Sequence, residues 1–467
     1  MTSQAKALVF AACIAMFPLC GFGPDSGARV SDGFIITAAP TYQPLAAIHG
    51  QERFPHGAQL LLVHQGMSKL LVSGFFATAD ANISFDGARV LFAGKRDASD
   101  LWQVWELTLA DKSLRQLTSG KEDAIRPFYL PGARFVYAQR TPAGFQLRAE
   151  LLGQSEGAEK VHAEVDLTAM QLTHANASAI PVDVLADGRI LFEAAFPLGS
   201  GTTPELYLVY SDGSGVESYR CDHGTARWGG KQLVSGDVVF THGASLARFT
   251  SPLAHEERIA APRAEYAGAI AETKSGEWLV SARSASEKNY AIKVWKPGES
   301  TLQTVLTESG NELVEPVLVA PRATPKRHPS GLHSWDYANL LALDARISRD
   351  GALKGVPATV RVEAKDATGH PVALGTAPIE ADGSYFVKVP GDKPIRFAVL
   401  DAKGSILRQE RGWFWARGGE QRICVGCHAG PERASENRVP AVLLRTTTPV
   451  DLTGPAVANQ TASAGGR

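Results

Sequence analysis

One repeated pattern in residues 57–325 constrains the fold more than any other feature of the chain. A turn that contains Gly is followed by a short apolar strand, a polar loop and a second pair of strands. The segment SFDGARVLFAGKRDASDLWQVWELTLADKSLRQLTSG contains a full copy, with strands expected at 89–93, 102–109 and 114–118. Related hairpin turns return at 131–132, 187–188, 236–237 and 275–276. A return every forty to fifty residues or so is the period of a β-propeller blade.

The two ends of this region complete each other. The segments AQLLLVHQG and SKLLVSG, at 58–66 and 68–74, read as two strands without partners. The segment VEPVLVAPR, at 314–322, reads as the inner strands that they lack. A composite blade built from both ends closes the ring and leaves no free sheet edge. We therefore predict an all-β chain with a six-bladed propeller over residues 46–325, with five or seven blades as the alternatives.

The form SFDGARVLF…LRQLTSG resembles the TolB-like class of propeller repeats. The propeller region contains no nucleophile elbow, no phosphate-cradling Gly loop and no supported pair of catalytic carboxylates. We expect this part of the chain to be a scaffold or a docking surface.

A second domain is expected after the segment PRATPKRHPSG, whose Pro and basic residues indicate a linker, placed at 326–333. Short strands with period-two patterning are predicted at 340–345, 358–364, 385–389, 395–400 and 406–409, with Gly-marked turns between them. This pattern predicts a small β-sandwich-like domain over residues 334–450, followed by a flexible tail at 451–467. An aromatic cluster, Trp413 to Trp415, is expected beside the motif that ends this domain.

That motif is CVGCH, which contains Cys424, Cys427 and His428. A thiol redox pair would require a βαβ context, and this context is all-β. A zinc site would need further ligands, and the adjacent Cys427 and His428 cannot easily both turn toward one tetrahedral ion. Covalent haem c requires this spacing, with two thioethers to the porphyrin and the next residue as proximal iron ligand. We predict one haem c, and two free buried thiols are the remaining alternative.

The first residues predict export. Lys6 precedes an apolar run that is too short to span a bilayer and ends in small residues, which is typical of a signal peptide, placed at 1–22. Cys20 is a possible lipid anchor, although Leu19 stands where lipoprotein cleavage prefers a small residue. No later stretch reaches the length of a membrane helix. Cys221 and His223 form a possible metal pair, with a packed thiol as the alternative.

The sixth iron position can be narrowed by counting residues. The four methionines are Met1, Met16, Met67 and Met170, and none lies in the predicted second domain. We favour His333, which opens that domain beside aromatic residues, and a surface histidine at the linker end is the alternative. His328 lies in the linker, His370 lies in a Gly-Pro turn, and Tyr337 is an oxygen-donor alternative. A histidine-ligated or open iron is predicted.

The order of a propeller and then EADGSYFVKVPGDKPIRFAVLDAKGSILRQERGWFWARGGEQRICVGCHAGPERASENRVPAVL resembles the hydrazine synthase alpha-subunit family. The resemblance implies that Cys424 and Cys427 attach a haem and that His428 is its proximal ligand. The family's subunit has a further domain with a second haem, whereas only RTTTPVDLTGPAVANQTASAGGR follows here. That difference removes the internal electron relay and weighs against hydrazine synthesis itself.

The predicted function is that of an exported or periplasmic monohaem c-type cytochrome, active in electron transfer or redox sensing with a partner protein or other subunits. One alternative is a haem enzyme that resembles the hydrazine synthase alpha subunit and acts on small nitrogen or oxygen species. Another is a TolB-like binding module with a structural haem. A formal net charge of -1 argues against a nucleic-acid-binding protein, which would need a clustered basic excess.

Overall fold

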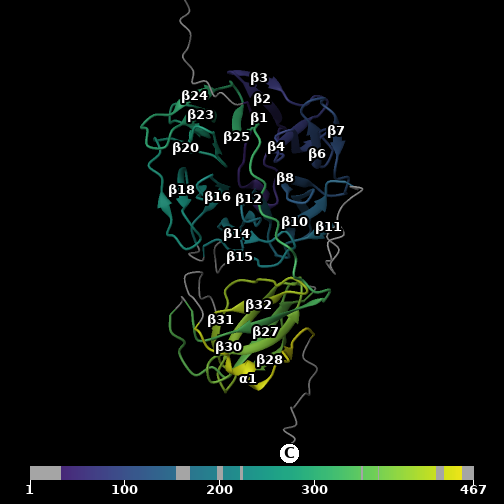
Figure 1. Cartoon of the computed structure of the whole chain (residues 1–467), viewed down its shortest axis with the longest axis vertical. Coiled ribbons are helices and arrows are strands. Elements are labelled where there is room, and N and C mark those ends of the chain that lie inside the picture. Colours follow the sequence, from purple (N-terminus) through teal and green to yellow (C-terminus); the bar gives the residue numbers. More distant parts are fainter. Residues whose placement is uncertain are drawn as a thin grey trace, which may run out of the picture.

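The computed structural model describes residues 33–153, 169–196, 203–220, 224–348, 351–366, 368–426 and 436–454. The predicted signal peptide, Cys20, the Cys221–His223 pair, Cys427 and His428 lie outside the described residues. The described residues form two units built from strands, a ring of sheets and a smaller unit beside it (Figure 1).

The ring contains six antiparallel sheets, as expected for a six-bladed propeller. One sheet has the order β25 (Glu312–Leu318), β1 (Phe34–Ala39), β2 (Gln59–His64) and β3 (Met67–Leu70). The next two are β4 (Ala77–Ile83), β5 (Arg89–Lys95), β6 (Gln103–Thr108) and β7 (Leu114–Gln116), then β8 (Ala124–Leu130), β9 (Arg134–Thr141), β10 (Gly144–Leu151) and β11 (Ala169–Gln171).

The other three sheets follow in chain order. They are β12 (Ala179–Val184), β13 (Ile190–Ala194), β14 (Glu205–Val209) and β15 (Glu217–Ser218), then β16 (Arg227–Gln232), β17 (Val238–His242), β18 (Ser245–Phe249) and β19 (Glu257–Arg258). The last contains β20 (Glu265–Tyr266), β22 (Trp278–Arg283), β23 (Ala291–Trp295) and β24 (Gln303–Leu306), and β21 (Ala271–Glu272) also pairs with β22.

The ring is closed by strands from both ends of the propeller region, but the division differs from the prediction. β25 supplies one strand, and β1, which was not predicted, lies between β25 and β2. The first sheet therefore begins at Phe34 and not at residue 46. β1 is buried along its whole length and pairs on both sides, so its sequence FIITAA lacks the polar alternation by which the other strands were recognised.

A charged cluster lies at the centre of the ring. β4, β8 and β25 each contain a bulge, and the residues with positive φ there are Asp80, Arg126 and Glu315. Arg53, from the segment between β1 and β2, forms ion pairs with Asp80 and Glu315, and Arg126 also pairs with Glu315 at 2.9 Å. The same segment carries the short 3-10 helix η1 (Ala46–His49), whose apolar residues pack against inner strands of several sheets. The N-terminal part of the ring therefore fills its centre.

The predicted linker is bound to the propeller. Its Lys326 backbone N–H donates to the carbonyl of Ala186 at 2.9 Å, and the His328 ring stacks on Tyr210 with centroids 3.8 Å apart. Two turn glycines with positive φ lie beneath it: a Cβ added at Gly87 would lie 2.9 Å from Pro321, and one at Gly188 would lie 2.1 Å from the Lys326 carbonyl. These turns lack side chains where the linker crosses.

Two of the turn glycines provide a matched test of this contact. Gly188 and Gly276 have φ values of +90° and +79°, but a Cβ at Gly276 would meet nothing within 4 Å. Gly276→Ala should cost about 1 kcal/mol, because only the left-handed backbone is strained. Gly188→Ala should cost a further 1–3 kcal/mol or so, because the linker must also move. Chemical unfolding of both variants measures the difference, and equal losses would contradict a bound linker.

The second unit is a two-sheet sandwich. One sheet has the order β32 (Gln421–Cys424), β26 (Tyr337–Ala342), β29 (Tyr385–Pro390) and β33 (Val450–Asp451). The other has the order β28 (Pro371–Pro378), β27 (Thr359–Lys365), β30 (Ile395–Leu400) and β31 (Ile406–Gln409). Apolar side chains from β26, β27, β29 and β30 form one core between them. The five predicted strands are found within a few residues of their expected bounds.

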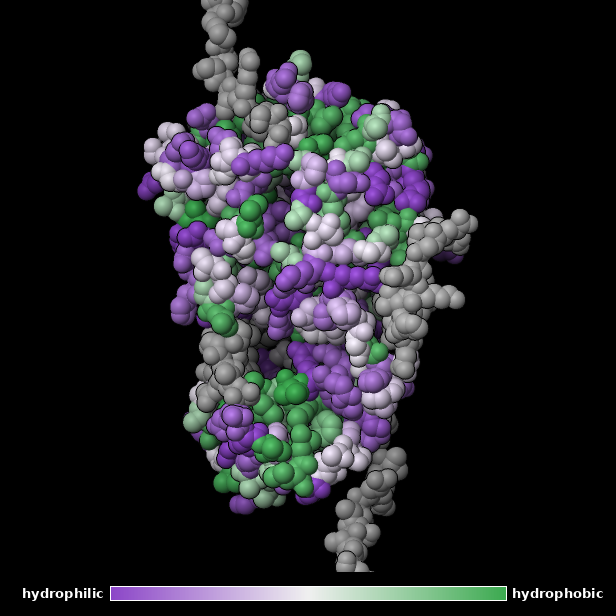
Figure 2. All heavy atoms as spheres, in the orientation of Figure 1, coloured by the Kyte–Doolittle hydropathy of each residue, from purple (hydrophilic) through white to green (hydrophobic). Residues whose placement is uncertain are grey.

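The sandwich also contains elements that the sequence analysis missed. β28 has mostly exposed side chains, β32 and β33 are short, and the helix α1 (Ala441–Arg445) was not expected. The predicted tail at 451 begins inside the domain: Asp451 pairs with the Lys388 ammonium at 2.7 Å, and Leu452 is buried in the core. Figure 2 shows hydrophobic side chains gathered on one face of this unit. Val356, Val372 and Ile406 are among its exposed large apolar residues.

Candidate functional site

Cys424 is the one residue of the CVGCH cysteine pair that the structure describes, and it ends the edge strand β32. β32 pairs in parallel with β26, with Cys424 opposite Ala342. The thiol is partly buried, is free, and packs against the sandwich core. Two residues later, a Cβ added at Gly426 would lie 2.8 Å from the Ile347 carbonyl. The middle of the motif therefore has no room for a side chain.

Two polar groups lie beside Cys424. Burial raises the pKa of the Cys424 thiol. The charge of Arg422 acts to lower this pKa, and the charge of Glu410 acts to raise it further. Burial also raises the pKa of Glu410 to about 7, against the opposing charges of Arg422 and Arg396. Glu410 Oε2 and Arg422 Nη1 are buried, and neither has a hydrogen-bond partner among the described residues. Arg422 Nη1 lies 3.8 Å from Glu420 Oε1, in an ion pair longer than a hydrogen bond. The site thus places a carboxyl with a raised pKa and a buried guanidinium next to the thiol.

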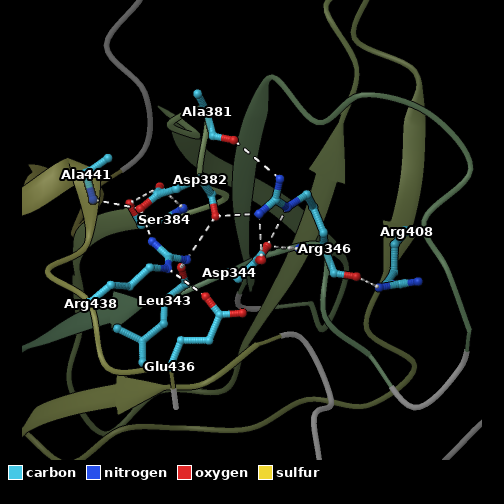
Figure 3. A network of polar contacts seen from close by, with 10 residues as sticks. All are labelled: Leu343, Asp344, Arg346, Ala381, Asp382, Ser384, Arg408, Glu436, Arg438 and Ala441. Carbon is cyan, nitrogen blue, oxygen red and sulfur yellow. Dashed lines mark hydrogen bonds and ion pairs between the residues drawn. The ribbon is translucent and has the colours of Figure 1, made fainter.

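A polar network holds the same end of the sandwich (Figure 3). The Arg346 guanidinium donates twice to Asp344, at 2.8 Å each, and donates to the Asp382 carbonyl at 2.8 Å. Arg438 pairs with the Asp382 carboxylate, which also accepts the backbone N–H of Ala441 at 2.7 Å. Burial alone would raise the pKa of Asp382, but these donors and Ser384 lower it to about 2. Arg438 and Ala441 thus attach the chain after residue 435 to the Asp382 turn. This turn lies close to Asp344, whose carbonyl Gly426 packs against.

Side chains beside the motif also join the sandwich to the propeller. Arg422 Nη2 donates to the Val216 carbonyl at 2.7 Å, and Glu420 accepts the Gly215 N–H at 3.2 Å. Trp415, predicted as part of an aromatic cluster at the cysteines, is instead buried in a core with strands β8–β14 and meets Phe196 edge-on at 6.0 Å. In Figure 1 the sandwich lies beside the sheets that contain β11 and β15. The candidate site is therefore held against two blades.

The structure does not bring His333 and Cys424 together. His333 is exposed, and its backbone N–H approaches the carbonyl of Gly419, before the start of β32. β32 then runs away from this contact, from Gln421 to Cys424, so the thiol lies at the far end of the strand. His333 instead begins a stack with Trp335 and Tyr337, with centroid distances of 4.2 Å and 5.0 Å.

The other candidate ligands also lie apart from Cys424 or in other contacts. His370 is exposed in the β27–β28 turn and bonds to Thr368 at 2.7 Å. Met67 is exposed on β3, and Met170 is buried in the propeller core that includes Trp415. Among the described residues, no three His, Cys, Asp or Glu side chains are grouped to hold a metal ion. Within the same residues, no helix has the length and apolar character to cross a membrane.

Sequence reasoning missed Glu410, Arg422 and Asp382 as neighbours of the motif. Asp382 lies in the turn of the segment EADGSYF, which indicates a hairpin but not what its carboxylate binds. Glu410 and Arg422 are ordinary charged residues in the sequence, and only the packing of β31 and β32 at one end of the sandwich brings them to Cys424.

Comparison with known protein families finds one match that covers this site. Residues 359–429 match the hydrazine synthase alpha subunit middle domain. The match confirms the resemblance inferred from the sequence, and the matched residues include Cys424, Cys427 and His428. The described part of the match contains the sandwich strands from β27 to β32.

The similarity in fold extends beyond that domain. The solved structure of Kuenenia stuttgartiensis hydrazine synthase is similar with a TM-score of 0.77 and 16% identity, over 89% of this chain and 71% of that chain. TolB from Acinetobacter baumannii is similar with a TM-score of 0.44 and 12% identity, over 62% of this chain and 67% of that chain. No curated protein matches the chain. The first likeness establishes that the propeller and sandwich are arranged as in the synthase chain.

Proposed function

We propose that this protein is an exported haem c redox protein of the hydrazine synthase alpha-subunit type, with one haem held by the CVGCH motif. Cys424 and Cys427 would attach the porphyrin, and His428 would be the proximal iron ligand. The observation that carries the proposal is the middle-domain match over residues 359–429, which contains all three. The spacing of the motif is the one that covalent haem attachment needs.

The described residues around the motif fit a haem. Cys424 is free and partly buried, as a thiol that forms a thioether at the edge of a core should be. Gly426 allows the motif to pass against Ile347 without a clash. The buried Glu410 Oε2 has no hydrogen-bond partner among the described residues, so it is a polar group beside Cys424 that a further partner would satisfy.

A bound haem would supply one-electron redox chemistry and a coordination site for small molecules. The chain's own residues would tune that chemistry. The Arg422 guanidinium would favour added negative charge beside Cys424, and the Glu410 carboxyl could hold or release a proton near neutral pH. The sandwich core excludes water from one side of Cys424. The interface with the propeller fixes Arg422 through the Val216 carbonyl.

We place the haem in a reaction centre for small nitrogen or oxygen species rather than in a simple electron carrier. The likeness to hydrazine synthase over 89% of this chain supports this role. A redox partner or further subunits would supply electrons. The second candidate is a monohaem electron-transfer or redox-sensing cytochrome, which the motif alone would support.

Absorbance spectra of the purified protein test the proposal. The reduced protein should show the sharp bands of haem c, and carbon monoxide should shift them, because an open iron binds the gas. Haem bands that carbon monoxide leaves unchanged would favour the electron-transfer cytochrome. A near-infrared band of methionine ligation would contradict the open or histidine-ligated iron. A protein without haem bands, made in cells that mature cytochromes c, would overturn the proposal as a whole.

A further inference from the structure

A polar cavity of about 100 Å³ lies in the propeller, between the segment that fills its centre and the β4–β7 and β8–β11 sheets. It is independent of the sandwich and of the CVGCH motif. Its acidic lining residues are Glu52, Asp80 and Asp123, and its basic lining residues are Arg53, Lys95 and Arg140. Three acidic and three basic side chains make a lining of zero formal net charge.

One pair of opposite charges lies on the side of β5. The Lys95 ammonium donates to Glu52 Oε1 at 2.8 Å, and the Trp102 indole N–H donates to the same oxygen at 2.8 Å. The Lys95 side chain is only 11% exposed. An ammonium has three N–H donors, and Glu52 accepts the one that has a partner among the described residues. Glu52 Oε2 accepts no hydrogen bond from them. Two N–H donors of Lys95 and one acceptor oxygen of Glu52 are therefore available to a ligand.

A second pair lies on the side of β8 and β9. Arg140 Nε donates to Asp123 at 2.9 Å, and Arg140 Nη1 donates to the Gly50 carbonyl at 3.0 Å. The other Asp123 oxygen accepts the Trp102 backbone N–H at 3.0 Å. The guanidinium also covers the Phe145 ring at 4.4 Å. Both Asp123 oxygens are thus occupied, whereas Arg140 Nη2 has no partner among the described residues.

The spare groups specify a ligand with two opposite charges. Lys95 and Arg140 offer N–H donors that suit a carboxylate, and Glu52 Oε2 offers an acceptor that suits an ammonium group. A lone anion or cation would leave one charge uncompensated in a lining that is already neutral, and this is costly beside Lys95 and Asp123, whose side chains are 11% and 15% exposed. A zwitterion satisfies both sets and adds no net charge.

We propose that this cavity binds a small zwitterion of the α-amino acid class, with its carboxylate at Lys95 and Arg140 and its ammonium at Glu52. The volume limits the size of the ligand. A water molecule occupies about 30 Å³ of liquid, and an engineered cavity of about 150 Å³ holds benzene. A cavity of about 100 Å³ suits glycine or alanine. The Trp102 and Phe145 rings provide apolar walls beside the two cations.

Thermal unfolding of the full chain with small probes tests this proposal. Glycine and alanine should each raise Tm, because a ligand that binds only the folded state stabilises it. Acetate and methylammonium each carry one half of the zwitterion, and at the same concentration they should raise Tm much less. Glycine affinity, measured by calorimetry, should fall at least tenfold in Lys95→Met and in Glu52→Gln.

Lys69→Met is the matched control, because Lys69 is exposed on β3 and does not line the cavity. It should bind glycine as the wild type does. Stabilisation by acetate as large as that by glycine would overturn the zwitterion in favour of a simple anion site. No response of the wild type to glycine or alanine would overturn the site, leaving a cavity that holds only water. Neither result depends on haem, so each is separate from the fate of the proposed function.

Discussion

Replacing Cys424 or Cys427 by Ala should remove covalently held haem from this protein. The wild-type chain should have an intact mass that exceeds the mass of its processed polypeptide by one haem. Each thioether depends on one thiol of the motif, so loss of either breaks the two-point attachment. Cys424 is also partly buried at the end of an edge strand, where no other described thiol can replace it. The measurement is intact mass together with haem staining after denaturation.

Cys221→Ala is the matched control, because this cysteine lies outside the CVGCH motif. It should retain the added mass and the haem stain, whereas both motif variants lose the stain or retain only a small fraction of it. The double variant should lose it completely. A wild-type mass equal to the bare polypeptide, from cells that mature cytochromes c, would contradict haem attachment. Retention of full haem in Cys424→Ala would contradict the role given to that thiol.

Arg53→Ala should destabilise the propeller by about 3–5 kcal/mol. The Arg53 side chain is 4% exposed, and its partners Asp80 and Glu315 are 2% and 8% exposed. Removing the guanidinium leaves Asp80 and Glu315 with Arg126 as their one remaining ion-pair partner among the described residues, at 3.5 Å and 2.9 Å. Such a loss is a large part of the stability of a typical domain. Chemical unfolding measures it, followed by the fluorescence of the propeller tryptophans.

The pH dependence of this loss separates charge from packing. Burial acts to raise the pKa of Asp80, but Arg53 and Arg126 outweigh it and hold that pKa below its ordinary value. In the wild type, this stabilisation is complete above about pH 4 and is lost as the pH falls through the lowered pKa. In Arg53→Ala the carboxylates take up protons more easily, so the deficit at pH 7 should shrink toward pH 5.

Arg89→Ala is the control for this prediction. Arg89 also pairs with a glutamate, Glu106, but its side chain is 38% exposed. Pairs of this kind contribute about 0–1 kcal/mol, so the control should unfold nearly as the wild type does. A loss in Arg53→Ala no greater than in Arg89→Ala, or a deficit that does not change with pH, would show that the central cluster is not held by charge.

Local patterns in the sequence determined much of this protein. The Gly-marked repeats predicted a ring of six sheets, because each hairpin turn requires a residue that accepts positive φ and each half-buried strand requires alternation. The sandwich strands from 358 to 409 were predicted closely for the same reason. CVGCH identified the candidate haem attachment site, because its chemistry depends on spacing along the chain and not on the fold.

Only the tertiary structure decided the remaining features, because each joins residues that are distant in the sequence. β1 is recognisable only from its pairing with β25 and β2. The left-handed bulges at Asp80 and Glu315 place these carboxylates on Arg53, a contact that strand periodicity cannot show. β32 pairs with β26 so that His333 and Cys424 lie at opposite ends, which separates two residues that the sequence analysis had assigned to one haem site. Contacts of this kind are set by how sheets close and pack, and no local sequence pattern encodes them.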